Sequence, residues 1–375
     1  GIGILTGGPG TGKTTCVSGI MAAFEKMIPN ARILLCAPTG RAAQRLAEST
    51  GREAVTIHRL LEYRPYGEKL IHKNIDNPLD ADLLIVDEGS MLSCSLASVL
   101  LSAVRSGALV IIIGDINQLP SVEPGDVLHD LIFSGLAPVC QLREVHRQAA
   151  GSSIICNAEL INDGFTELVE DDRFHIQYAG NQTGIADQII EAVKALYNPK
   201  TPFATQVLAP VYRDDAGVGV LDKRLQDFLN PGRGEKEIRY GDRTFRCRDK
   251  VILLSNNYVQ GYYNGDSEIG NSCLTVQLAN KQICLSHELM DDIDLAYCIS
   301  VHRSQGSEFT NVIISLPNAR NLVKNLLYTG ITRAKERVVI VAQNGAVYTA
   351  IQNSSFGVRN SYLIPRMQTA CKLCA

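Results

Sequence analysis

Apolar residues in this chain gather in short continuous runs, and stretches with helical periodicity lie between them. The runs fall at residues 2–5, 33–37, 83–86, 110–113, 207–209, 312–316 and 338–341. Strands that are apolar at every position are typical of parallel sheets with helices on both faces. The pattern therefore predicts an α/β fold, in which ligands bind beyond the carboxyl ends of the strands.

A glycine-rich segment follows the first run. Residues 7–14, GGPGTGKT, match the pattern GxxxxGK[ST] and lead into a helical stretch at 15–27. In such a loop Lys13 reaches the outer phosphates and the Thr14 hydroxyl binds Mg²⁺, while backbone N–H groups surround the phosphates. The expected nucleotide contacts are Gly8, Pro9, Gly10, Thr11, Gly12, Lys13, Thr14 and Thr15. The predicted cofactors are ATP and Mg²⁺.

Two acids follow the run at 83–86. Asp87 can hold the magnesium shell, and Glu88 can orient and deprotonate the attacking water. A helix N-cap accounts for Asp87 alone but not for both acids. After the run at 110–113, Gln118 in GDINQLP can touch the γ-phosphate, or it can be a turn residue bonded to local backbone.

The second half of the chain repeats the strand and helix pattern without a second phosphate loop. Two halves that meet over one nucleotide can close when ATP is bound and open after hydrolysis, provided that the second half senses the γ-phosphate. Arg147 in LREVHRQ and Arg333 in TGITRAKER are the candidate sensors. Each of them can instead belong to a surface ion pair.

Composition narrows the class of protein. The chain has 375 residues, more than one ordinary domain, and no apolar run reaches the ~18 residues needed to span a bilayer. The net charge of −3 mildly disfavours a nucleic-acid binder, since such domains are commonly basic overall, so any DNA or RNA contact must be local, in a groove. The 11 cysteines lie mostly in apolar stretches, which indicates reduced thiols and a cytoplasmic protein. Cys371 and Cys374 form a CxxC pair, either half of a zinc site or part of a frayed tail.

Eight segments carry a resemblance to a known family. They are LTGGPGTGKTT, LLCAPTGRAAQRL, TIHRLL, LLIVDEGSM, IIIGDINQLPSV, LREVHRQ, ISVHRSQGSEF and LLYTGITRAKERVVIV. In this order they resemble the helicase motifs of superfamily 1, and specifically those of its RecD and TraA branch. The resemblance covers nearly the whole chain. It implies two RecA-like domains, ATP hydrolysis in the cleft between them, and 5′ to 3′ movement along single-stranded DNA.

The resemblance also implies roles for the matching residues. Lys13, Thr14, Asp87, Glu88 and Gln118 keep the roles given above, and Arg147 and Arg333 match the two arginines that approach the γ-phosphate, with Arg333 as the arginine finger. The residues expected near the nucleotide as coupling groups are Gly306 and Glu308. The residues expected along the DNA path are Pro38, Thr39, Thr56, His58 and His302.

Two features depart from the family pattern. The chain begins at the first strand, without the adenine-recognition segment that usually precedes it, so we expect a fragment that lacks its natural start. Gly89 stands where the family more often has a small side chain such as alanine, and we expect it to loosen the start of the following helix slightly.

We expect the first RecA-like domain at residues 1–140 and the second at 141–375. An insert at about 62–80 is polar and broken, which predicts a hairpin; by resemblance it is a strand-separating pin, and a surface loop is the alternative. A second insert at 232–295 changes to short strands with turn signals, which predict a small β-barrel, SH3-like by resemblance.

The second insert has a candidate nucleic-acid surface. Its residues 233–250 hold seven Lys and Arg against four Asp and Glu. Cations and nearby tyrosines suit single-stranded nucleic acid, and a solvated charged face is the alternative. The tyrosines are Tyr258, Tyr262 and Tyr263, and Asn256 and Asn257 are further candidate DNA contacts.

The favoured interpretation is a monomeric, ATP-dependent DNA helicase of repair or recombination. It would act on single-stranded DNA and on forked or 5′-tailed duplexes. One alternative is a translocase or motor subunit of a larger recombination complex that does not separate strands itself. The other is a P-loop kinase of small substrates, against which GDINQLP and the second half of the chain argue.

Overall fold

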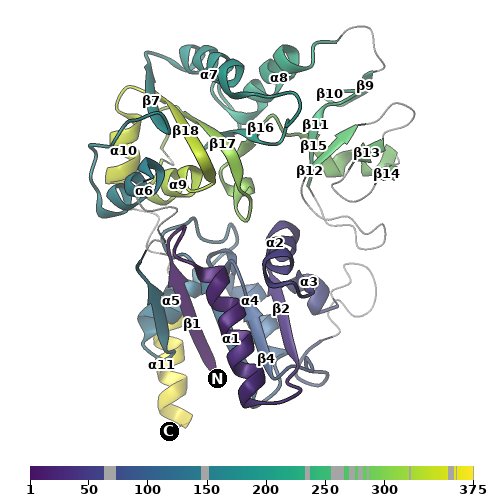
Figure 1. Cartoon of the computed structure of the whole chain (residues 1–375), viewed down its shortest axis with the longest axis vertical. Helices are drawn as coiled ribbons and strands as arrows, with labels where there is room; N and C mark the ends of the chain where they lie inside the picture. Colours follow the sequence, from purple (N-terminus) through teal and green to yellow (C-terminus); the bar gives the residue numbers. More distant parts are fainter. Residues whose placement is uncertain are drawn as a thin grey trace. The chain divides into compact units, whose positions relative to one another are not determined.

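The computed structural model forms two compact units, Gly1–Gly151 with Phe356–Ala375, and Ser152–Ser355 (Figure 1). It describes the chain except at residues 63–72, 145–151, 233–236, 255–265, 270–274, 278–281, 285–286, 321, 354–358, 360 and 375. The division differs from the expected boundary at residue 140, and it returns the C-terminal residues to the first unit. The physical reason for that return is that helix α11 (Leu363–Cys374) packs against α5 (Val127–Ser134).

The first unit is built on a parallel sheet with the order β3-β2-β4-β5-β1-β6. Its strands are β1 (Ile2–Gly7), β2 (Ile33–Ala37), β3 (Ala54–Thr56), β4 (Leu83–Val86), β5 (Leu109–Gly114) and β6 (Val139–Leu142). Besides α5 and α11, its helices are α1 (Lys13–Met27), α2 (Gly40–Thr50), α3 (Ile57–Leu60), η1 (Gly89–Met91) and α4 (Cys94–Ser102).

Strand β4 is apolar at every position because both of its faces are buried. All four of its side chains are buried, and alternate ones belong to different core clusters. Leu83 and Ile85 lie in the cluster that contains residues of α1 and α2, whereas Leu84 and Val86 lie in the cluster that contains residues of α4 and α5. Helices therefore cover both faces of the sheet, as the continuous runs predict.

The second unit contains another parallel sheet, with the order β16-β8-β17-β18-β7. Its strands are β7 (Phe174–Ala179), β8 (Thr205–Ala209), β16 (Cys298–Ser300), β17 (Phe309–Leu316) and β18 (Ala334–Gln343). Its helices are α6 (Ser153–Asp163), α7 (Gln182–Leu196), α8 (Val218–Leu229), η3 (His302–Ser304), α9 (Lys324–Ile331) and α10 (Ala346–Gln352). The predicted α/β fold with parallel sheets is confirmed in both units.

An antiparallel insert lies between α8 and β16 in the sequence, where the short strands were expected. It contains a two-stranded sheet and a five-stranded sheet with the order β14-β13-β12-β11-β15. Its elements are β9 (Glu237–Tyr240), β10 (Arg243–Arg246), β11 (Lys250–Leu253), β12 (Asp266–Ile269), β13 (Thr275–Gln277), β14 (Gln282–Cys284), η2 (His287–Asp292) and β15 (Ile293–Leu295). The SH3-like form of this insert stays a prediction.

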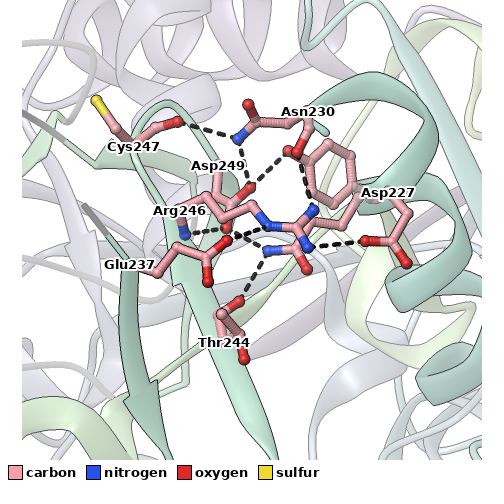
Figure 2. Close-up of polar contacts among 9 residues, drawn as sticks. Asp227, Asn230, Glu237, Thr244, Arg246, Cys247 and Asp249 are labelled. Atoms are coloured by element: carbon pink, nitrogen blue, oxygen red, sulfur yellow. Dashed lines mark hydrogen bonds and ion pairs between the residues drawn. The ribbon is translucent and has the colours of Figure 1, made fainter. Parts of the chain in front are cut away.

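A polar network joins the insert to helix α8 (Figure 2). The guanidinium of Arg246 donates to Asp227 Oδ1 at 2.8 Å, to Glu237 Oε1 at 3.1 Å and to the carbonyl oxygen of Asn230 at 2.9 Å. The buried carboxylate of Asp249 accepts from Asn230 Nδ2 at 2.8 Å and from the backbone amide of Arg246 at 2.6 Å. These contacts fix the first strands of the insert on the end of α8.

The structure gives three cations of the basic stretch at 233–250 structural contacts. Arg246 is occupied by two carboxylates, and Arg243 donates to the carbonyl oxygens of Ile293 and Met290. Lys250 is buried and donates to the carbonyl oxygen of Thr205 at 3.2 Å. These three cations are structural because they satisfy buried or partly buried acceptors, and they are not a phosphate-binding face.

Candidate active site

The predicted site residues of the first unit follow neighbouring strands at one edge of its sheet. The phosphate loop follows β1, Asp87 follows β4, and Gln118 follows β5, and these three strands are adjacent in the order β4-β5-β1. Pro38 and Thr39 follow β2, which is next to β4. Because all of these strands are parallel, their carboxyl ends share an edge, where such sheets bind ligands.

The phosphate loop has a backbone that side chains would obstruct. Gly10 and Gly12 have φ of 72° and 81°, in the left-handed region that favours glycine. A Cβ on Gly7 would lie 2.6 Å from Thr11 Oγ1. That hydroxyl donates to the carbonyl oxygen of Gly8 at 2.9 Å. The loop is therefore tightly turned at the start of α1.

Lys13 lies over this loop. Its Nζ donates to the carbonyl oxygens of Gly7 at 2.7 Å and Gly8 at 2.9 Å. Thr14 and Thr15, the next two residues of α1, are exposed. The helix N-terminus, the ammonium group and the exposed hydroxyls form a donor set suited to the phosphates of a nucleotide with its Mg²⁺.

Hydrogen bonds with backbone groups fix Asp87 at the end of β4. Its amide donates to the carbonyl oxygen of Cys36 at 2.9 Å, and its Oδ1 accepts from the amide of Glu88 at 2.8 Å. Burial and the nearby charge of Glu88 raise the pKa of Asp87 to about 6, although Lys13 and Arg45 act in the opposite direction. A divalent cation beside this carboxylate would offset both the burial and the repulsion, so the donor fits Mg²⁺.

The backbone turns sharply between the two acids and the following helix. Glu88 has φ 52°, a left-handed conformation that non-glycine residues rarely adopt. Gly89 comes next and begins η1. A Cβ there would lie 2.6 Å from Ile112 Cγ2 and 3.0 Å from the carbonyl oxygen of Ile113. The glycine therefore permits close packing of η1 on β5, a role that was not predicted, and its effect on the helix start stays a prediction.

Asp115 organises the turn that carries Gln118. Its buried carboxylate accepts from the amide of Asn117 at 3.0 Å and from Gln118 Nε2 at 3.4 Å. The amide of Gln118 donates to the carbonyl oxygen of Asp115 at 3.2 Å. These are the local bonds that a turn residue makes, and the contact of Gln118 with a γ-phosphate stays a prediction.

Arg333 lies in the second unit and is 4% exposed. Its guanidinium donates to the carbonyl oxygen of Thr329 at 3.2 Å, to that of Ser307 at 3.3 Å and to Thr332 Oγ1 at 3.4 Å. All of these acceptors are neutral, and among the residues that the structure describes no carboxylate forms an ion pair with it. The alternative of a surface ion pair is therefore wrong for Arg333.

The two other predicted coupling residues of the second unit lie near this arginine in the fold. The backbone amide of Phe309 donates to the carbonyl oxygen of Arg333 at 2.8 Å, which joins the segment before β17 to the start of β18. In that segment Gly306 has φ 72°, and the exposed Glu308 pairs with Lys335 at 3.2 Å. The structure thus brings Gly306, Glu308 and Arg333 together at the amino ends of β17 and β18.

The candidate DNA residues of the first unit have structural roles as well. Thr39 and Thr56 are N-caps, because their hydroxyls accept from the amides of Ala42 at 3.3 Å and Arg59 at 3.2 Å. His58 lies in α3, where burial lowers its pKa although Glu123 acts in the opposite direction. This charge interaction with Glu123 was not predicted, because the two residues are far apart in the sequence.

In the second unit, His302 follows β16 and begins η3. Its neighbour Arg303 lies over the ring of Tyr212 at 5.4 Å and pairs with Asp294 at 3.6 Å. Tyr212 is 48% exposed. This arginine and tyrosine form an exposed cation–π pair that sequence reasoning missed, since only the pairing of β16 with β8 brings them together.

Some predicted residues lie outside the described part of the chain. They are Arg147, Asn256, Asn257, Tyr258, Tyr262, Tyr263 and residues 63–72 of the expected pin. No helix in the described ranges combines the length and the apolar character required to cross a membrane.

Comparison with known proteins identifies the family. A family model described as an AAA domain matches residues 1–124, and one described as a UvrD-like helicase C-terminal domain matches residues 295–341. The chain is 31% identical to the RecBCD enzyme subunit RecD of Mycolicibacterium smegmatis, over 99% of this chain and 73% of that protein. The chain belongs to the RecD family. The resemblance that the motifs carry is thereby confirmed.

This RecD-family chain is also similar to another curated protein and to solved structures. It is 36% identical, over 97% of its residues, to the ATP-dependent RecD2 DNA helicase of Deinococcus radiodurans, and it spans 50% of the length of that protein. A Pif1 helicase from Candida albicans has the same fold, with a TM-score of 0.56 and 16% identity over 98% of this chain and 95% of that one. The structure of Bacteroides Pif1 bound to single-stranded DNA is similar with a TM-score of 0.54 and 18% identity, over 99% of this chain and 94% of that one.

Proposed function

We propose that this RecD-family chain is the motor of an ATP-dependent DNA helicase that moves 5′ to 3′ along single-stranded DNA. The observation that carries the proposal is the carboxyl edge of the first sheet, where the phosphate loop, Asp87 with Glu88, and Gln118 follow three adjacent strands. The second unit has a parallel sheet without a phosphate loop. One nucleotide site and two such units suit a cycle of closing and opening.

The first unit would bind ATP with Mg²⁺. Residues 8–15 would hold the phosphates, with Lys13 as their main cation, and Thr14 and Asp87 would hold the metal. The metal would supply positive charge against the charge that develops on the transferred phosphate. Glu88, next to Asp87, would orient and deprotonate the attacking water, and Gln118 would contact the γ-phosphate.

Arg333 would be the arginine finger, and Arg147 the second arginine that approaches the γ-phosphate. The surroundings of Arg333 support this role: three neutral acceptors orient the guanidinium without cancelling its charge. A buried cation without a carboxylate partner is costly unless an anion approaches it. Gly306 and Glu308 would couple the nucleotide to DNA, since they lie on the segment that Arg333 contacts through Ser307.

The DNA path would run past Pro38, Thr39, Thr56 and His58 in the first unit and past His302, Asn256 and Asn257 in the second. The two units would be RecA-like domains, with the pin at 62–80 in the first and the SH3-like insert at 232–295 in the second. The protein would work in the cytoplasm as a monomer, in DNA repair or recombination, on forked or 5′-tailed duplexes. We include the Tyr212 and Arg303 pair as a candidate base-stacking contact.

A second candidate function is that of a motor subunit in a larger complex. The mycobacterial relatives are named as subunits of the RecBCD enzyme, which favours this alternative. In that case the chain would move on single-stranded DNA, and partner subunits would separate or cut the strands.

ATP hydrolysis with and without single-stranded DNA tests the proposed function. A DNA-dependent increase in kcat supports either motor, and the variant Lys13→Ala serves as the blank. Hydrolysis that is insensitive to DNA would instead support the small-substrate kinase.

A further inference from the structure

The segment that follows the second unit returns to the first unit and binds one of its loops. Arg359 Nη1 donates to the carbonyl oxygens of Glu123 at 2.8 Å and Gly125 at 3.0 Å. Two residues later the Ser361 hydroxyl donates to the carboxylate of Asp130 in α5. Helix α11 then lies along α5 (Figure 1), and its Leu363 and Met367 pack against the core cluster there.

The loop that Arg359 holds, residues 119–126, continues directly from Gln118 and ends at Asp126, the N-cap of α5. On its other side the loop is fastened to the start of α4. The Glu123 carboxylate accepts from Ser93 Oγ at 2.6 Å and from Ser95 Oγ at 2.9 Å. Ser93 is the N-cap of α4 and lies five positions after Glu88.

The fit between loop and helix is close. The amide of Cys94 donates to the carbonyl oxygen of Pro124 at 3.1 Å. Gly125 has φ 109°, and a Cβ on it would lie 2.4 Å from Cys94 Sγ. The loop thus lies between the start of α4, which follows the catalytic acids, and Arg359, which follows the last residue of the second unit by four positions.

Residues 119–126 also approach a candidate DNA contact. The serine hydroxyls lower the pKa of the Glu123 carboxyl, and His58 lowers it further through its charge. One loop therefore contacts the start of α4 after the catalytic acids and continues from the turn with Gln118, and its Glu123 interacts through charge with His58. Arginine suits this junction because its guanidinium is permanently charged and planar, and one of its nitrogens, Nη1, donates to both carbonyl oxygens.

We propose that Arg359 is a positioning residue for ATP hydrolysis. Through the carbonyl oxygens of Glu123 and Gly125 it fixes the loop that follows Gln118. The proposal rests on the proposed ATPase function and adds a residue that lies outside its helicase motifs.

The test compares Arg359→Ala with Arg359→Lys and with Arg366→Ala. Arg366 is exposed in α11, so its substitution removes the same charge from the same segment without touching residues 119–126. Hydrogen exchange of the peptide covering 119–126 reports loop fixation, and steady-state kinetics report hydrolysis. We expect faster exchange and a kcat about threefold to tenfold lower in Arg359→Ala, with KM for ATP unchanged, because bonds from a charged donor are lost.

Arg359→Lys should recover part of kcat, and Arg366→Ala should behave as the unmodified protein in both measurements. Unchanged exchange in Arg359→Ala would overturn the fixation of the loop, and faster exchange with unchanged kcat would overturn the positioning role. Arg359→Gln, which keeps a polar side chain, replaces the alanine variant if that variant does not fold. Absence of hydrolysis in the unmodified protein would contradict the proposed function, while the exchange comparison would still decide whether Arg359 fixes the loop.

Discussion

The guanidinium of Arg333 donates to the carbonyl oxygen of Ser307 at 3.3 Å, so two motifs that are 26 residues apart meet in the second unit. The contact explains how a buried arginine keeps a defined orientation without an acidic partner. It also joins the proposed finger to the segment of Gly306 and Glu308. Substitutions here should separate nucleotide binding from turnover.

Arg333→Ala should leave the Kd for ATP within about threefold and lower kcat about 1,000-fold or more, because a finger stabilises charge mainly in the transition state. Equilibrium binding of a fluorescent ATP analogue and steady-state hydrolysis measure the two effects. The control is Arg337→Ala, an exposed arginine of β18, which should change neither. If binding and turnover fell together in Arg333→Ala, the arginine would be structural.

Gly89→Ala should destabilise the protein by about 1–3 kcal/mol, because the added methyl group collides with Ile112 and the backbone of Ile113. Gly19→Ala is the matched control: Gly19 lies in α1 with nothing within 4 Å of its added Cβ, so alanine there should be neutral or stabilising. Denaturant unfolding of both variants measures the difference. Equal stability of the two would show that η1 can move away from β5 at little cost.

Asp87 should make hydrolysis depend on pH. Its folded pKa of about 6 lies above the ordinary value, so protons compete with Mg²⁺ for the carboxylate and the rate should fall as pH falls through about 6. Higher Mg²⁺ should move this midpoint to lower pH. Rate profiles at two Mg²⁺ concentrations check the prediction, and a midpoint that does not respond to Mg²⁺ would assign the titration to another group.

The same shift has a consequence for stability without metal. A carboxyl group whose pKa is raised on folding stabilises the folded state when protonated, and this contribution is lost as pH rises through about 6. Asp87→Asn should therefore be more stable than the unmodified protein at pH 7 and lack this part of the pH dependence. Unfolding at pH 5 and pH 7 measures both effects, and an asparagine variant that is less stable at pH 7 would contradict the sign.

Arg246→Ala should lower stability by about 1–3 kcal/mol, since it removes bonds to Asp227, Glu237 and Asn230. It should leave the salt dependence of DNA affinity unchanged, because its charge is already paired. Arg239→Ala is the control: Arg239 is exposed in β9, so its loss should spare stability and would reduce the salt slope by about one if it contacts a phosphate. The opposite pattern would restore the basic stretch as a phosphate-binding face.

The site of the first unit could be predicted from the sequence because its residues come directly after apolar strands. The runs at 33–37 and 83–86 coincide with β2 and β4. Because parallel sheets bind ligands beyond the carboxyl ends of their strands, this rule points to the phosphate loop and Asp87. The rule does not reach Arg333, which precedes β18. The need for a γ-phosphate sensor in the second half of the chain made Arg333 a candidate, and the motif resemblance gave it the role of finger. Only the fold shows that its surroundings are neutral.

Other features depend on contacts that periodicity does not encode. Gly89 has its packing role because β5 passes within van der Waals distance, and Arg246 is structural because α8 brings Asp227 to it. The return of the C-terminal segment to the first unit depends on Arg359 finding carbonyl oxygens more than 200 positions earlier in the chain. Such long-range contacts assign the C-terminal segment to the first unit, whereas the pattern of strands and helices placed the boundary at about residue 140.

The measurement that tests the central claim most directly is strand displacement from a duplex with a 5′ single-stranded tail, beside a duplex with a 3′ tail. Lys13→Ala is the blank, and Lys26→Ala, an exposed lysine of the same helix, is the matched control. The account predicts ATP-dependent unwinding of the 5′-tailed substrate alone, lost with Lys13 and kept with Lys26. Unwinding of the 3′-tailed substrate alone, or equal unwinding by Lys13→Ala, would contradict it.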